Sequence, residues 1–442
     1  MKFIETLKNI WKIEELRNRL LTTLLLVAVF RFGSFVVLPG IDPSSLTGLR
    51  SQTSEGIMSL LDMFTGGAFS NASVFGLGIM PYISASIVIQ LLGIAVPYFQ
   101  KLQREGESGR RKMNQYTRYL TVFVLLLQGP AFLANLSSQG VPLPSGFWFR
   151  FSSVILLAAG SMFTLWLGER ITDKGIGNGV SMIILIGIIA RLPQALVQEF
   201  ASRLETASGG LVMFLLEIIV LLAVTIFAIL LVQGTRKVPV QYAKRMVGNK
   251  QYGGVRQYIP LKVNAAGVMP IIFAQAIMFI PLMFMRFSTT GGGSRFWQMM
   301  TNINGFWYNF IYALLIILFT YFYTAITINP VQMAEDMKRN GGYIPGVKTG
   351  KKTADYLDEI MSRITLPGSF ALALVAIIPA FAKNFGISAG FAQFFGGTSL
   401  LILVGVVLDT LQQIESHLLM RHYDGLLKSG RIKGRTGNIA AY

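Results

Sequence analysis

Few residues in this sequence have the type and spacing that catalysis requires. The two histidines, His417 and His422, both lie near the C-terminus, so no imidazole base is placed to serve the serines and aspartates elsewhere. The chain has no cysteine, which excludes disulfides and thiolate ligands, and no residue spacing matches a zinc site. The sequence therefore predicts a protein with no catalytic residues, no cofactor and no bound metal.

One segment shares part of its pattern with a phosphate-binding loop. Residues 346–352 read GVKTGKK, but the four-residue spacer and the Ser or Thr after the lysine are missing. A solvated basic turn explains this segment better. A membrane-embedded hydrolase would also need a nucleophile and a base in reach of each other, and the sequence offers no such pair.

Amide side chains within apolar segments are the next candidates. Gln90, Gln128 and Gln275 each interrupt a long apolar run. An amide in hydrocarbon must find a hydrogen-bond partner, so these side chains either bond within a helical core or line a wet seam between helices. The sequence leaves both interpretations open.

Ionisable residues within the apolar segments bear on transport. Arg31, Glu217 and Asp409 lie in three different segments, and a helix-end or interhelical ion pair is the favoured interpretation for each. No acidic pair is placed to relay protons or sodium ions. A secondary transporter of a small solute therefore remains only the alternative function.

Long apolar segments must position all of these residues. Of the 442 residues, 52% are hydrophobic and 14% are charged, and the mean hydropathy is +0.55. Soluble domains have about twice that charged fraction. We predict an all-α polytopic membrane protein whose spans lie at 20–38, 74–97, 118–137, 151–169, 180–198, 210–233, 263–285, 306–328, 365–382 and 394–418.

Basic residues are distributed unequally between the loops on the two sides. An even number of spans places both termini on one side, and that side carries most of the lysines and arginines. The opposite loops hold only Arg50, Arg150, Arg203, Arg286, Arg295 and Lys383. The positive-inside rule then predicts that both termini are cytoplasmic. Residues 1–19 are expected to form an amphipathic helix on the membrane surface, and residues 419–442 a cytoplasmic tail.

The stretch 56–97 joins a half-polar segment to a spanning one. Residues 56–73 carry Asp62 and a run of small polar residues, whereas residues 74–97 are apolar and are interrupted by Pro81. Polar or irregular backbone persists at membrane depth only inside protein or beside a water-filled cavity. We therefore expect the half-polar segment to form a short helix that sits in a cavity.

Two cytoplasmic loops, 234–262 and 329–364, are too long to be simple connections. In the first, residues 238–242 alternate like a strand and Gly253–Gly254 suits a hairpin turn. The second begins with a short helix after Pro330. Its tip is basic, with Lys348, Lys351 and Lys352. We expect two structured fingers outside the membrane, a pattern that favours a docked partner over a role in orientation and anionic-lipid binding alone.

Several passages together resemble the SecY family, the pore subunit of the protein-conducting channel. They occur in the family's order and cover most of the chain. They include FRFGSFVVLPGID at 30–42, MFTGGAFSNASVFGLGIMPYISASIVIQLL at 63–92, EGESGRRKMNQYTRY at 105–119, LGERITDKGIGNG at 167–179, IPLKVNAAGVMP at 259–270 and FYTAITINP at 322–330.

The resemblance implies an hourglass-shaped channel built from two pseudo-symmetric halves of five helices, 20–198 and 210–418, joined by an external hinge loop at 199–209. The plug would be the helix at 56–73, with Asp62, Phe64, Gly66, Gly67 and Asn71. The waist would be a ring of Ile83, Ile87, Ile184, Ile272 and Ile402. The lateral gate would lie between the second and seventh spans, with Gln90, Gln128 and Gln275.

The same resemblance implies partners in a bacterial plasma membrane. SecE and SecG would be the companion subunits, and the SecA motor and the ribosome would dock on the fingers. Docking residues would be Arg245, Lys250, Arg256, Lys348, Lys351 and Lys352. Secretory and membrane proteins would be the substrates, with YidC, SecD/SecF and anionic lipid as further partners. Lys348 stands where many bacterial members have Arg, which puts a bidentate contact with the motor in doubt.

Overall fold

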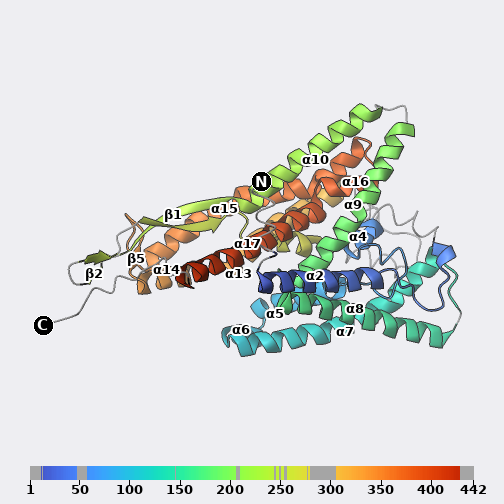
Figure 1. Cartoon of the computed structure of the whole chain (residues 1–442), viewed down its shortest axis with the longest axis horizontal. Helices are drawn as coiled ribbons and strands as arrows, with labels where there is room; N and C mark the ends of the chain where they lie inside the picture. Colours follow the sequence, from blue (N-terminus) through green and yellow to red (C-terminus); the bar gives the residue numbers. More distant parts are fainter. Residues whose placement is uncertain are drawn as a thin grey trace.

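The computed structural model is mostly helical and elongated, and its long axis runs along the main helices (Figure 1). The structure describes residues 11, 13–46, 57–144, 146–205, 210–242, 245–247, 250–252, 256–275, 277–278 and 305–428. Residues 14–19 of the predicted surface helix belong to α2, and residues 419–428 of the predicted tail belong to α17, whereas residues 1–10, 12 and 429–442 lie outside these ranges.

The first half of the chain forms one group of helices. Its elements are α2 (Glu14–Gly33), η1 (Pro43–Ser45), α4 (Ile57–Phe64), α5 (Met80–Ala95), α6 (Pro97–Arg104), α7 (Glu107–Ser138), α8 (Phe147–Lys174) and α9 (Gly179–Glu205). Helices α7, α8 and α9 pack in sequence order, and α2 lies against α8.

The second half forms another group. Its helices are α10 (Gly210–Gln233), α13 (Phe306–Thr327), α14 (Pro330–Arg339), α15 (Lys351–Asn384), α16 (Ala389–Ala392), η2 (Gln393–Phe395) and α17 (Gly397–Lys428). Residues 269–275 and 277–278 are also helical. The two groups meet where α9 contacts both α10 and α17.

Seven helices in the described ranges are long and apolar enough to cross a membrane, or eight if the bent pair α5–α6 counts as one span. The remaining predicted spans correspond to α2 and to the segment 263–285, whose described part ends at residue 278. A multi-pass, all-α membrane fold is confirmed, and it is consistent with the predicted set of ten spans.

Two prolines set the bounds of the helix that forms within the second predicted span. Residues 74–79 form turns, and α5 begins only at Met80, with Pro81 in its first turn, where the missing amide proton is tolerated. Pro97 ends α5 because it restrains Val96 to an extended backbone. The chain then bends by 99° into α6. The helix therefore begins where the interruption at Pro81 was expected, and it is shorter than the predicted span at 74–97.

The two predicted fingers form a single unit at one end of the molecule (Figure 1). Strands β1 (Thr235–Tyr242) and β4 (Arg256–Lys262) are antiparallel, with Thr235 opposite Lys262, and the short β5 (Gly342–Tyr343) pairs with the other edge of β1. Strands β2 (Arg245–Val247) and β3 (Lys250–Tyr252) form a separate hairpin. Gly253 and Gly254, the predicted turn, lie outside the described residues.

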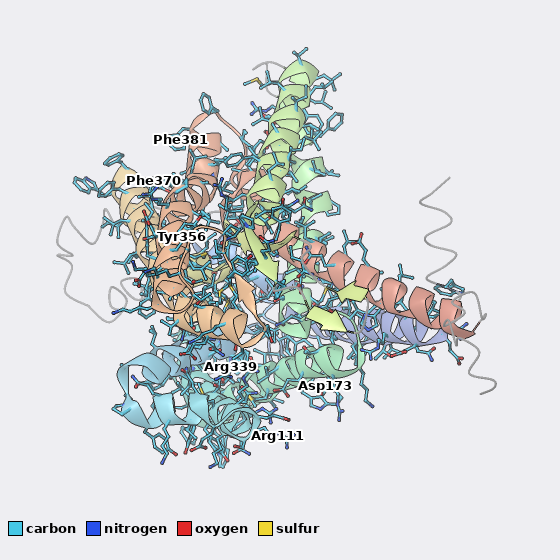
Figure 2. The ribbon with its side chains drawn as sticks, turned by 90° about the vertical axis from the view of Figure 1, so that its left-hand side faces the viewer. Arg111, Asp173, Arg339, Tyr356, Phe370 and Phe381 are labelled. Atoms are coloured by element: carbon cyan, nitrogen blue, oxygen red, sulfur yellow. The ribbon has the colours of Figure 1, made fainter. Side chains whose placement is uncertain are left out.

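A small apolar core joins this sheet to the second loop. Val238 and Val240 of β1 and Leu261 of β4 pack with Met337 of α14 and Leu357 of α15. The basic loop therefore has its own hydrophobic support, and α15 extends without a break from this core towards the opposite end of the molecule. Figure 2 views this end and labels Arg111, Asp173, Arg339 and Tyr356 among its side chains.

Candidate functional site

The predicted plug lies in the middle of the helix groups and is only partly helical. Helix α4 covers residues 57–64, and turns occupy residues 65–79. Residues 57–79 together are named the plug segment. Gly66 and Gly67 have φ angles of +65° and +92°, which end the helix because only glycine adopts them without strain. The expectation of a helix over 56–73 was therefore too long. Gly56 lies outside the described residues.

Asp62 fixes the plug segment to α9. Its carboxylate forms an ion pair with Arg191, and its Oδ1 accepts a hydrogen bond of 2.7 Å from the Ser70 amide. Arg191 also donates to the Ser70 hydroxyl at 2.7 Å. Asp62 and Ser70 are both buried. The polar residues that make this segment a poor membrane span thus also bond it to the wall around it.

A second arginine holds the plug segment from α2. The Arg31 guanidinium donates to the Gly66 carbonyl oxygen at 2.7 Å and lies 5.3 Å from the centre of the Phe35 ring. An ion pair was expected for Arg31, but its observed partner is a backbone dipole. A Cβ atom on Gly66 would lie 2.8 Å from the Arg31 Nη1 and 2.9 Å from the Gly187 Cα, so this contact requires glycine.

Further hydrogen bonds connect the plug segment to the chain after α2 and to η2. Leu38 donates its amide proton to the Ala72 carbonyl and Val74 donates to that of Val36, which forms a short antiparallel bridge. The Gln393 amide of η2 donates to the Ser59 hydroxyl at 2.9 Å. The plug segment therefore touches elements from both halves of the chain.

The five predicted waist isoleucines lie at a junction between two apolar clusters. Ile184 of α9 and Ile402 of α17 are buried in one cluster, together with Phe64 of the plug segment. Ile87 of α5 is buried in the second cluster. Ile83 and Ile272 pack against both clusters. The structure thus gathers residues from four separate segments, and four of the five isoleucines belong to, or pack against, the cluster that contains Phe64.

The three amides predicted at the gate are not bonded to one another. Gln90 donates to the Ser86 hydroxyl one turn earlier on α5, at 3.3 Å, and Gln128 is half-buried on α7. Gln275 is buried and lines a cavity of about 80 Å³ beside Tyr308 and Tyr312 of α13. Ile87 of α5 instead shares an apolar cluster with Ile271, Phe273 and Ala274.

The predicted docking residues are only partly described. Lys348, Lys351 and Lys352 are exposed at the turn before α15 and at its start. The Lys348 carbonyl accepts a hydrogen bond from the Thr353 hydroxyl at 2.9 Å, which shapes that turn. Arg245, Lys250 and Arg256 lie in β2, β3 and β4, and their side chains lie outside what the structure describes.

Sequence reasoning missed a buried charge cluster at the junction of the halves. Arg203 of α9 forms ion pairs with Glu199, at 3.0 Å, and with Glu217 of α10, at 2.5 Å. It also donates to the Gly386 carbonyl, and Glu199 accepts from the Ser388 amide. The interhelical ion pair expected for Glu217 is confirmed. Its partner was not predicted, because Arg203 was assigned to an external loop.

Another residue that sequence reasoning left without a role is Arg191. The signal was present, because an arginine inside an apolar segment needs a polar partner at the same depth. Asp62 was the matching acid, but the two residues are far apart in sequence, and only the fold brings them together. Asp409, by contrast, hydrogen-bonds to Gln413 on its own helix, and no ion pair to it is found among the described residues.

Comparison with known proteins identifies the family. The SecY family profile matches residues 73–411. The protein translocase subunit SecY of Streptomyces galbus is 43% identical over 430 residues, which covers 94% of this chain and 97% of that protein. The chain belongs to the SecY family. The protein translocase subunit SecY of Escherichia coli K12 is 42% identical over 430 residues, covering 95% of this chain and 96% of that protein.

Solved structures share the SecY-family fold at much lower sequence identity. A protein-conducting channel is similar with a TM-score of 0.65 and 18% identity, over 90% of this chain and 92% of that one. A second, in a study of a SecY plug domain that stabilises the closed state, has a TM-score of 0.60 and 17% identity over the same shares. Sec61 from a canine ribosome–channel complex has a TM-score of 0.61 and 17% identity, again over 90% and 92%.

Proposed function

We propose that this SecY-family chain is the channel-forming subunit of the Sec translocon and carries out no catalytic reaction itself. It passes unfolded secretory proteins across the bacterial plasma membrane and releases transmembrane segments sideways into lipid. The observation that carries the proposal is that Phe64 of the plug segment shares one apolar cluster with Ile184 and Ile402. A half-polar segment thus rests on a junction of isoleucines drawn from both halves.

The waist is proposed to seal by excluding water. A narrow ring of branched apolar side chains dewets, and ions cannot cross it without losing their hydration. Ile83, Ile87, Ile184, Ile272 and Ile402 are the residues assigned to the ring. An unfolded chain could displace the plug segment and pass this ring, because side-chain rotations in a thin constriction need no large rearrangement of the helices.

The lateral gate is proposed to open between α5 and the helical residues 269–275 and 277–278. Ile87 of α5 shares one apolar cluster with Ile271 and Ala274 of this segment. Gln90 and Gln275 flank this seam as polar groups that water or an incoming segment can hydrogen-bond. Hydrophobic segments would then leave through an interface whose lining resembles lipid.

Partners are proposed from the family and from the charge distribution. SecE and SecG would be the companion subunits, with YidC, SecD/SecF and anionic lipid as further partners. The SecA motor and the ribosome would dock on the unit formed by β1, β4, β5 and the turn at Lys348. Exposed lysines on a folded support favour an acidic or nucleic-acid surface. The docking face would be cytoplasmic, as would both termini.

Reconstitution tests this function against the transporter alternative. The purified chain, its small companion subunits, the motor and ATP would be combined in vesicles with a labelled, unfolded precursor. Protection of the precursor from external protease, dependent on this chain, is the expected result. If the vesicles instead accumulate a small solute without motor or precursor, and protect no precursor, the transporter alternative holds.

A further inference from the structure

Two helices begin with the same aromatic pattern. Residues 146–151 read GFWFRF at the start of α8, and residues 305–310 read GFWYNF at the start of α13. Each therefore carries Phe, Trp and Phe at the same three positions. These two sets are named the α8 triad, Phe147, Trp148 and Phe151, and the α13 triad, Phe306, Trp307 and Phe310.

The two triads also share their geometry. The two phenylalanines are stacked with ring centres 6.0 Å apart in both triads, at interplanar angles of 14° and 16°. The tryptophan meets the second phenylalanine edge-on in both, at 6.5 and 6.4 Å. Each triad thus presents one continuous aromatic surface whose rings contact mainly one another.

Both aromatic surfaces are uncovered. The six side chains are between 50% and 78% exposed, although they are among the largest apolar groups in the chain. Two such patches on a water-facing surface would be an aggregation liability. Their exposure indicates that a medium other than water surrounds them.

The position of the triads indicates which medium. Each begins a helix long enough to span a membrane. Helix α13 leads directly into α14 beside the sheet, so the α13 triad lies at the end of its span away from the basic docking unit. Helix α8 likewise ends at Lys174 and begins at its triad. Both triads therefore lie at the membrane boundary opposite the basic loops.

Helix α8 carries a second tryptophan, and its distance from Trp148 is close to the thickness of the hydrocarbon core. Trp166 lies 18 positions after Trp148, which is about 27 Å along a helix at 1.5 Å per residue. The hydrocarbon core of a bilayer is about 30 Å thick. Trp166 is also exposed, and the Arg170 guanidinium lies 5.3 Å from its ring centre. One helix thus places an indole near each boundary of the hydrocarbon, and an arginine lies close in sequence to each, Arg150 to Trp148 and Arg170 to Trp166.

We propose that the α8 and α13 triads bind the glycerol and headgroup region of the outer leaflet and set the depth of the chain in the bilayer. Tryptophan favours this region because its large ring is buried while the indole N–H stays near water, and the two stacked phenylalanines of each triad extend the apolar surface beside it. A companion protein is a less suitable occupant than lipid. The two triads are separate surfaces on different helices, and what they have in common is the membrane boundary at which they lie.

Depth-dependent quenching tests the proposal. Single-tryptophan variants of the full chain, each retaining Trp148, Trp307 or Trp166 with the other tryptophans changed to Phe, would be reconstituted in phosphatidylcholine brominated at a shallow, middle or deep acyl position. All three should lose most fluorescence to the shallow bromine. A matched control, Leu222→Trp in a tryptophan-free background, sits midway along α10 on a 57% exposed site and should show the reverse order.

Two outcomes would overturn the proposal. One is strongest quenching of Trp148 or Trp307 by the deep bromine. The other is no quenching of either while Leu222→Trp is quenched, which would mean that protein covers the triads. Should the single-tryptophan chains fail to fold, Trp148→Phe and Trp307→Phe in the otherwise unaltered chain should each remove part of the shallow-quenched emission. The result is independent of channel activity, so it can fail while the proposed function holds.

Discussion

The buried carboxylate of Asp62 in α4 and the partly exposed guanidinium of Arg191 in α9 form an ion pair that joins the plug segment to the wall of the proposed channel. The same arginine bonds the Ser70 hydroxyl, and the same carboxylate accepts from the Ser70 amide. The plug segment also has apolar contacts, with Met63, Phe64 and Phe69 buried in two clusters, so these polar bonds add to an apolar interface. Three polar groups that exchange bonds among themselves can hold the plug segment firmly when buried and release it once water or an incoming chain reaches them.

Removing the charge of Asp62 should loosen the plug segment. Asp62→Asn keeps an oxygen for the Ser70 amide but leaves Arg191 without its counter-ion, and because the Arg191 side chain is 26% exposed the cost falls below the ~3–5 kcal/mol of a fully buried pair. We expect a higher resting ion conductance in planar bilayers. Asp173→Asn makes the same chemical change at an exposed position near the end of α8, outside the plug segment, and should leave the conductance unchanged. Equal conductance in the two variants would mean that the pair does not hold the plug closed.

Gly66 should tolerate no side chain. Gly66→Ala places a Cβ atom within 3 Å of Arg31 and Gly187 and also strains a backbone with φ of +65°. Gly140→Ala is the matched control, because its φ of +83° brings the same strain with nothing within 4 Å. Strain alone costs about 1–2 kcal/mol. The thermal midpoint in detergent should fall further for Gly66→Ala, and an equal fall in both would refute the close approach.

The Arg203 cluster should stabilise the junction between the halves. Arg203→Gln leaves Glu199 and Glu217 buried without their cation, a loss of about 3–5 kcal/mol. Arg363→Gln breaks an exposed pair with Glu359, worth less than about 1 kcal/mol. Chemical denaturation in detergent should show a much larger loss in the free energy of unfolding for Arg203→Gln than for Arg363→Gln. Similar losses would show that the buried cluster adds little to stability.

Charge reversal at the turn before α15 should weaken docking of the cytoplasmic partner. Lys348→Glu with Lys351→Glu reverses two exposed charges, so folding should be unaffected. Lys101→Glu with Lys112→Glu changes the net charge equally on the same side of the membrane. Binding of the motor, measured by co-sedimentation with vesicles, should fall several-fold for the first pair only. Equal losses would point to general attraction by the cytoplasmic face.

Sequence patterns predicted the fold class because membrane spans need long apolar runs, and hydropathy alone reveals them. They also predicted β1 and α14, since the alternation along residues 238–242 and the proline at 330 are local signals. The pairing of β5 with β1 was not predictable from two separate loops. The bend at Pro97 was not predictable either, because hydropathy over residues 74–97 reports how apolar the residues are and not where the backbone changes direction.

In the candidate site, too, features set by neighbouring residues were predictable from the sequence, whereas contacts between residues far apart in the sequence were not. The composition of residues 56–73 indicated a half-polar segment in a cavity, and that segment is indeed buried. What held it there depended on Arg31 and Arg191, which come from two other helices. Their partners, a glycine carbonyl and an aspartate, become visible only when the helices are placed in space.

The central claim is that a polypeptide passes through the ring of five isoleucines, and crosslinking tests it most directly. A photoreactive residue would replace Ile83, Ile87, Ile184, Ile272 or Ile402 in turn, and a precursor would be stalled in reconstituted channels. Ile219 and Ile226, exposed on the outer face of α10, are the controls. We predict crosslinks to the precursor from the five positions and none from the two controls. Crosslinks from none of the five, or equally from all seven, would contradict the account.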